Sequence, residues 1–135
     1  MRFVAGLILC IFTPFALVSS LAQRAAPKHE ATTMSLQCAT GDCPLLKGMP
    51  QTAGLRSGYV RLQPGESVGW HTTGQNEEAL VILHGKGEAI IEGAGKMPVT
   101  EHMLAYIPPA TRHNVTNTGA ELLEYVYVVA PAAEK

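Results

Sequence analysis

From Gly54 to the C-terminus, apolar residues come in short runs that are separated by turn-forming residues. Glycine and proline recur every eight to twelve residues, and no stretch has the spacing of a long amphipathic helix. Many short β-rich runs with regular turn signals are typical of an all-β sandwich or barrel. The segments expected to carry strands are 57–63, 67–73, 77–96, 102–119 and 121–131.

Two apolar runs inside segment 77–96 are divided by Gly85-Lys86-Gly87. A glycine-containing connection of this length between two such runs is typical of a β-hairpin. The sequence therefore predicts that the two runs are paired antiparallel strands.

Residues 1–22 have the three parts of a secretory signal: a basic residue at Arg2, an apolar middle, and the small residues Ser20-Leu21-Ala22. Cleavage after Ala22 would leave 113 residues and place the protein in the periplasm or outside the cell. The alternative is an uncleaved membrane anchor, but Thr13-Pro14 interrupts the run, and a spanning helix needs about 20 apolar residues. We therefore expect a cleaved signal peptide.

Residues 23–50 keep no helical or alternating pattern, so we expect an N-terminal arm that packs against the following domain. The arm holds Cys38 and Cys43, which are the only cysteines left once the signal is removed. An even pair in an exported chain favours a disulfide. A redox pair and half of a metal site are the alternatives, although redox pairs usually have two intervening residues rather than four.

Without residues 1–22, the chain has nine basic and eleven acidic residues, a net charge of −2. This charge is too small and of the wrong sign to suggest nucleic acid or an anionic membrane as a partner. A mature chain of this length is sufficient for one compact core.

Alternation along a strand predicts which side chains point inward. Glu78 shares a face with two apolar residues, Leu80 and Ile82, so its carboxylate is directed toward the core, where an unpaired charge is unfavourable. His71 and His113 fall on the expected inner faces of their own segments. Together the three form a set of two histidines and one carboxylate, which can hold a metal ion and leave positions open.

Each of these residues also has an ordinary structural interpretation. A lone histidine at a strand edge is usually hydrogen-bonded within the protein, and Glu78 could lie at a solvated rim beside Glu77. The combination of the three residues favours the metal site.

Two spaced motifs resemble those of the cupin superfamily, over about residues 54–130. The first motif comprises Gly65, His71, Thr73, Glu78 and Gly85. The second comprises Pro108, Ala110, His113 and Asn117, with His102 where the family usually begins this motif with glycine.

The resemblance implies a small double-stranded β-helix barrel over residues 51–135, often dimeric, with a metal ion in its mouth. It implies that His71, Glu78 and His113 are metal ligands for a divalent ion such as Mn, Fe, Ni or Zn. Thr73 stands where the family usually has a second histidine, and a hydroxyl is a weaker ligand for such ions.

Three functions remain open at this point. The first is a metal-dependent enzyme with oxygenase-, isomerase- or lyase-type chemistry on a small molecule. The second is a non-catalytic barrel that binds a small ligand, and the third is a structural barrel whose site has decayed. For the enzyme, the aromatic residues available to shape an apolar pocket are Tyr59, Trp70, Tyr106 and Tyr127, although alternation places some of them outside.

Overall fold

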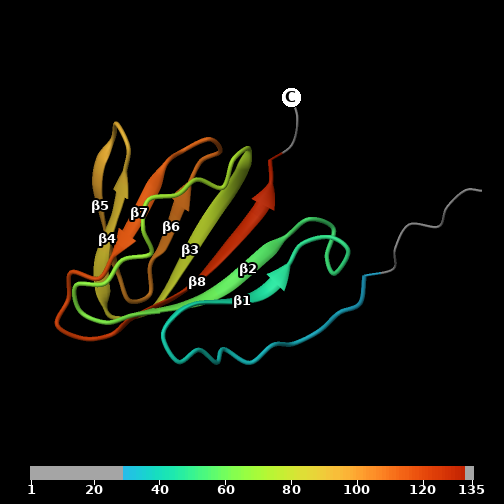
Figure 1. Cartoon of the computed structure of the whole chain (residues 1–135), viewed down its shortest axis with the longest axis horizontal. Coiled ribbons are helices and arrows are strands. Elements are labelled where there is room, and N and C mark those ends of the chain that lie inside the picture. Colours follow the sequence, from blue (N-terminus) through green and yellow to red (C-terminus); the bar gives the residue numbers. More distant parts are fainter. Residues whose placement is uncertain (1–28, 133–135) are drawn as a thin grey trace, which may run out of the picture.

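The computed structural model describes residues 29–132, which form two antiparallel β-sheets (Figure 1). The larger sheet has the strand order β1-β2-β8-β3-β6 and the smaller has the order β5-β4-β7. The all-β class and the double-stranded β-helix architecture predicted from the sequence are confirmed. The strands are β1 (Gly41–Lys47), β2 (Arg56–Leu62), β3 (Asn76–His84), β4 (Lys86–Ile91), β5 (Gly95–Thr100), β6 (Leu104–Ile107), β7 (His113–Thr116) and β8 (Leu123–Pro131).

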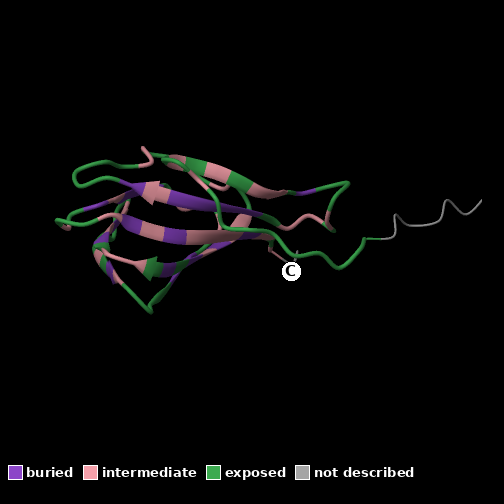
Figure 2. Cartoon of the chain, turned by 90° about the horizontal axis from the view of Figure 1, so that it is seen from below, coloured by how far each residue is buried: buried purple, intermediate pink, exposed green. Residues whose placement is uncertain are grey.

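The core lies between the two sheets, and along strands such as β3 buried residues alternate with more exposed ones (Figure 2). On β3 the inward residues are Glu78, Leu80 and Ile82, as alternation predicts, and all three are buried. The smaller sheet contributes Ala89 and Val115 to the same apolar cluster. One carboxylate is thus placed at the end of an otherwise apolar row.

The predicted hairpin at Gly85-Lys86-Gly87 is wrong. β3 pairs with β6 and β8, whereas β4 pairs with β5 and β7, so the chain passes from one sheet to the other at Gly85. Gly85 has a φ of 78°, and a Cβ there would collide with the backbone carbonyl of Leu122. The glycine signal therefore marks a close crossing between the layers rather than a reversal within one sheet.

The strand predicted over 67–73 is also wrong as a continuous element. Only two isolated bridges form there, Ser67 with Thr116 and His71 with His113. Gly69 lies between them with a φ of 84°, a conformation that interrupts a pleated strand. The segment is thus bridged to β7 at both ends but forms no continuous strand with it.

The N-terminal arm adds an edge strand that the sequence pattern did not predict. β1 pairs with β2, and its register shifts between Pro44 and Leu46. β5 was missed as well, because it is short and includes Gly95 and Pro98, two residues that usually signal a turn. The predicted disulfide is confirmed, with Cys38 and Cys43 bonded and their Cα atoms 5.7 Å apart.

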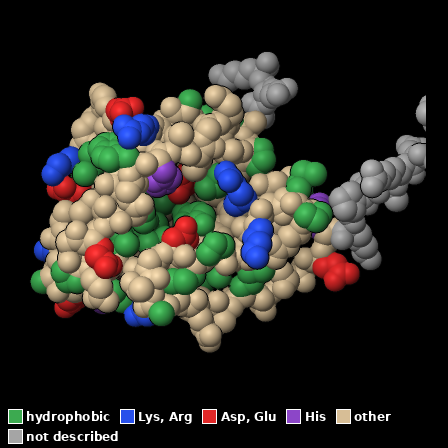
Figure 3. All heavy atoms as spheres, in the orientation of Figure 1, with side chains coloured by type: hydrophobic (Ala, Val, Ile, Leu, Met, Phe, Trp, Pro, Cys, Tyr) green, Lys and Arg blue, Asp and Glu red, His purple; other side chains and the backbone are tan. Residues whose placement is uncertain are grey.

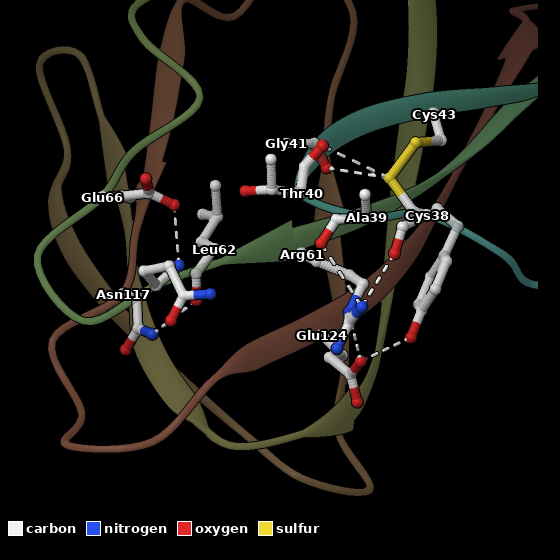
Figure 4. A network of polar contacts seen from close by, with 12 residues as sticks. Cys38, Ala39, Thr40, Gly41, Cys43, Arg61, Leu62, Glu66, Asn117 and Glu124 are labelled. Carbon is white, nitrogen blue, oxygen red and sulfur yellow. Dashed lines mark hydrogen bonds and ion pairs between the residues drawn. A yellow bond between two sulfur atoms is a disulfide. The ribbon is translucent and has the colours of Figure 1, made fainter.

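A hydrogen-bond network ties the disulfide loop to the barrel (Figure 4). Arg61 Nη1 donates to the Cys38 carbonyl at 2.8 Å, and Arg61 Nε donates to Glu124 Oε1 at 2.8 Å. Tyr59 also donates to Glu124 Oε1, at 2.7 Å. β1 therefore enters the sheet from an anchored loop.

The predicted signal peptide, residues 1–22, lies outside the described residues. Between residues 29 and 132, no helix has the length and apolar character needed to cross a bilayer.

Candidate metal centre

The two histidines of the candidate site come from adjacent backbone segments. His71 N donates to the His113 carbonyl at 3.0 Å, and His113 N donates to the His71 carbonyl at 2.9 Å. This reciprocal pair is the bridge left from the interrupted 67–73 segment. It brings the two imidazole rings side by side, with their centroids 4.3 Å apart and their planes at 59°.

Backbone carbonyls fix the orientation of both rings. His71 Nδ1 lies 3.0 Å from the Gly69 carbonyl, and His113 Nδ1 lies 3.1 Å from the Thr111 carbonyl. A carbonyl can only accept, so each neutral ring carries its proton on Nδ1 and leaves Nε2 with a free lone pair. This arrangement is common for histidines that bind a metal through Nε2.

Glu78 completes the group from β3, where it pairs with Ile107 of β6 and Val129 of β8. It is only 4% exposed, and His113 is 0% exposed. One ligand atom from each of His71, Glu78 and His113 can be chosen so that all three lie within 4.8 Å of one another. The structure therefore brings together the three residues that the sequence singled out.

The contact between Glu78 and His113 has an unusual feature. Glu78 Oε2 and His113 Nε2 lie 3.1 Å apart, yet neither atom has a hydrogen bond of acceptable direction to any described residue. With the proton of His113 on Nδ1, both facing atoms are acceptors, and two buried acceptors repel unless a cation lies between them. A proton or a metal ion can serve as that cation, so the donor set fits a divalent metal.

The pKa of His113 is set by opposing effects of burial and of its neighbours. Burial alone lowers the pKa of the His113 imidazole, but the Glu78 carboxylate and the Thr111 carbonyl raise it, and the net result is a raised pKa. Metal binding therefore competes with a proton on this ring.

Thr73, at the position usual for another histidine, forms hydrogen bonds within a turn. Its hydroxyl donates to the Asn76 carbonyl at 2.9 Å, while Asn76 Nδ2 donates back to the Thr73 carbonyl at 2.7 Å. These bonds close the turn that leads into β3. The Thr73 hydroxyl proton is thus engaged in the turn, although the residue also lines the cavity beside His71.

No other histidine that the structure describes joins this group. His84 lies at the far end of β3, where its ring nitrogens are 3.4 Å from Glu101 and 3.6 Å from Glu121. His102 is an exposed residue beside Glu101.

The three candidate ligands line a cavity of about 650 Å³ between the sheets. His71 is exposed as a residue but faces this cavity rather than the outer surface of the barrel. Figure 3 shows the hollow, with hydrophobic side chains on its floor and histidine, acidic and basic side chains around it. The aliphatic side chains of the lining are those of Leu46, Val60, Leu62, Val68, Leu80, Val115 and Val129, with Pro44 beside them. A cavity of this size and character is typical of a small-molecule site.

The aromatic lining differs in part from the expectation. Tyr127 lines the cavity, whereas Trp70 and Tyr106 are exposed and Tyr59 binds Glu124 on the other face of the sheet. Tyr125 was not singled out but also lines the cavity. Its alternation with Leu123, Tyr127 and Val129 is the signal that could have identified it.

Both cavity tyrosines remain protonated at neutral pH. Burial, followed by the nearby Glu78 carboxylate, raises the pKa of Tyr125 far above its usual range. Burial, followed by Asp42, raises the pKa of Tyr127 to about 12. The Tyr127 ring lies against Gly58, where a Cβ would collide with it, and its hydroxyl lies 3.4 Å from Asp42 Oδ2. Tyr125 and Tyr127 therefore contribute neutral phenols to the cavity lining, and the Tyr127 hydroxyl donates to Asp42.

Comparisons with known proteins agree with this architecture. The chain is 30% identical over 89 residues to the protein named "Polyketide synthase CurC" from Streptomyces cyaneus, over 64% of this chain and 57% of that relative. This chain thus spans little more than half the length of that curated relative.

Solved structures share the fold at lower identity. A cupin protein from Bacteroides fragilis has 22% identity and a TM-score of 0.62, over 77% of this chain and 86% of that one. A predicted oxalate decarboxylase from Thermotoga maritima has 18% identity and a TM-score of 0.54, over 73% of this chain and all of that one.

The sequence profile of the Cupin domain family matches residues 58–129, which run from β2 to β8 and include all three candidate ligands. This match covers more than half of the chain, and it agrees with the two-sheet architecture. The chain belongs to the cupin family.

Proposed function

We propose that this cupin holds a divalent metal ion through His71, Glu78 and His113 and acts on a small molecule bound in the cavity. The observation that carries the proposal is the buried pair of acceptors, Glu78 Oε2 and His113 Nε2, which lie 3.1 Å apart without a hydrogen bond. A donor set of two imidazoles and one carboxylate suits Mn, Fe(II), Ni and Zn.

Three protein ligands leave coordination positions for a substrate, as catalytic sites require. When bound, the ion would supply Lewis-acid polarisation of a substrate oxygen. Tyr125 would donate a hydrogen bond to the bound molecule, since its raised pKa keeps the phenol protonated. The apolar lining would exclude water from the reacting groups. Oxygenase-, isomerase- and lyase-type reactions are all compatible with these roles.

The known relatives support a small organic molecule as the ligand. One is named as a polyketide synthase and another as a predicted oxalate decarboxylase. The alternative is a barrel that binds such a molecule without turnover. Thr73 favours this alternative, because its hydroxyl is engaged with Asn76 at a position where the family usually has an imidazole.

We further propose that the protein is exported and forms a homodimer. The signal-like residues 1–22 and the Cys38–Cys43 disulfide support export to an oxidising compartment. Intact mass of the exported protein tests this, because cleavage after Ala22 predicts a mature chain that begins at Gln23.

A homodimer is supported by an apolar patch on the outer face of the larger sheet. Val81, Leu104 and Tyr106 lie there on β3 and β6, and Leu104 is 67% exposed. Exposed apolar patches of this kind often mark protein interfaces.

Calorimetric titration with Mn, Fe(II), Ni and Zn tests metal binding directly. We expect one ion per chain in the wild type and no binding in His71→Ala, because two remaining ligands compete poorly with water. His84→Ala is the matched control, since His84 lies outside the group, and it should bind as the wild type does. Binding that survives His71→Ala would contradict the proposed ligand set.

A further inference from the structure

The strand register places two basic residues in the same row as the candidate ligand Glu78. Glu78 on β3 is paired with Val129 on β8, Val129 with Arg56 on β2, and Arg56 with Lys47 on β1. Directly paired residues of neighbouring strands point to the same face of a sheet. Glu78, Val129, Arg56 and Lys47 all line the same cavity, as this register requires.

From this row we infer the class of ligand: a small organic anion whose one end binds at the metal centre and whose carboxylate binds Arg56, with Lys47 beside it. The inference rests on the proposed metal site and adds the chemistry of the molecule that fills the cavity.

The spacing of the row suits a molecule of modest size. Neighbouring strands lie about 4.8 Å apart, so the Cα atoms of Glu78 and Arg56, two strands apart, are separated by roughly 10 Å. Side chains that reach into the cavity from both ends shorten the gap between their polar groups. Val129 lies between them in the row, and Leu80 and Tyr127 form the adjacent row on the same face. The ligand body is thus expected to be apolar or aromatic.

Arg56 is available to bind such a group. Between residues 29 and 132, no carboxylate forms an ion pair with it, in contrast to Arg61 on the outer face, which binds Glu124. The aliphatic part of Arg56 packs close to Gly48, where a Cβ would lie 3.2 Å from Arg56 Cγ. Arginine binds carboxylates through two parallel hydrogen bonds, so it gives both affinity and orientation.

The charges of the cavity lead to the same conclusion. Its lining includes two cationic side chains, Lys47 and Arg56, and two carboxylates, Asp42 and Glu78. These charges cancel, so a bound divalent ion leaves the cavity with an excess of positive charge. An anionic ligand would compensate this excess, whereas a cationic one would increase it.

The test uses two metal-chelating probes that differ by one carboxylate group. The zinc-loaded protein is titrated with benzohydroxamate and with 4-carboxybenzohydroxamate, whose rigid ring holds the chelating group and the carboxylate at opposite ends. We expect the wild type to bind the carboxylated probe at least tenfold more tightly. In Arg56→Met, this preference should fall several-fold, with Lys47 and the ion accounting for what remains, while the affinity for benzohydroxamate stays the same.

Two controls separate the possible failures. Lys96→Met removes an exposed cation of β5 that lies outside the cavity and should keep the wild-type preference. The inference would be overturned if the zinc-loaded wild type did not prefer the carboxylated probe, or if Arg56→Met kept the wild-type preference. Either result would still be consistent with the proposed metal site. Failure of the wild type to bind zinc would overturn both. Retained zinc binding by Arg56→Met shows that the variant is folded.

Discussion

Replacing Glu78 with glutamine distinguishes two roles for this residue, a metal ligand and a structural ion-pair partner. Glutamine keeps the size of the side chain and removes the negative charge, at a position that is only 4% exposed. If Glu78 is a ligand, the metal-free protein contains a buried carboxylate without a hydrogen bond on Oε2. Glu78→Gln should then leave the stability of the metal-free protein unchanged or raise it, and should weaken metal binding.

The size of the effect follows from linkage. At a free metal concentration of 100 times Kd, binding stabilises the wild type by about 2.7 kcal/mol. A 100-fold loss of affinity leaves the variant near its own Kd, where the gain is only about 0.4 kcal/mol. For a domain of this size each kcal/mol shifts Tm by about 4–8 °C, so the metal should raise Tm by roughly 11–22 °C in the wild type and about 2–3 °C in the variant.

The assay is thermal unfolding with and without metal, and Glu77→Gln is the matched control. Glu77 is adjacent but contacts Tyr106 on the other face of the sheet, so its substitution should leave the metal-induced shift intact. Breaking a structural ion pair between Glu78 and His113 would instead destabilise the metal-free protein by about 3–5 kcal/mol. Such a loss, together with no metal-induced shift in the wild type, would refute the reasoning.

Four further predictions address other parts of the molecule. Thr73→His should tighten metal binding tenfold or more by calorimetry, because it adds an imidazole beside the cavity; unchanged affinity would show that the new ring does not reach the ion. The raised pKa of Tyr127 favours its neutral form in the folded state, so its contribution to stability should be complete below pH 10 and be lost as the pH rises toward 12. Alkaline denaturation of Tyr127→Phe should therefore show a smaller loss of stability over this range, by less than about 2.7 kcal/mol. Replacing Cys38 and Cys43 together by serine should lower the free energy of unfolding by about 2 kcal/mol in denaturant titrations, and no change would mean that the hydrogen bonds of Arg61 and the pairing of β1 with β2 hold the loop without the disulfide. Leu104→Glu should convert the proposed homodimer to a monomer in sedimentation experiments, whereas a persisting dimer would place the interface elsewhere.

The parts of the fold that could be predicted are those with a local signal. Alternation in β3 correctly placed Glu78, Leu80 and Ile82 inward, and the spacing of two motifs identified His71 and His113. These signals depend on only a few neighbouring residues.

The errors concern long-range pairing. Gly85 carries the same turn signal whether the chain reverses or crosses to another sheet, and only the contact with Leu122 decides between them. β1 contains a proline and a shift of register, so its pairing with β2 is not visible in its own pattern. Arg56 was overlooked because its relation to Glu78 runs through Val129, across three strands.

The central claim, that His71, Glu78 and His113 hold an ion, is tested most directly by the metal content of the protein purified without added metal. Elemental analysis of the wild type should find close to one divalent ion per chain, and His113→Ala, prepared in parallel, should contain almost none. The account would be contradicted if the wild type contained no metal and also bound none when Mn, Fe(II), Ni or Zn was added. Equal metal content in both proteins would contradict it as well, because the ion would then be bound elsewhere.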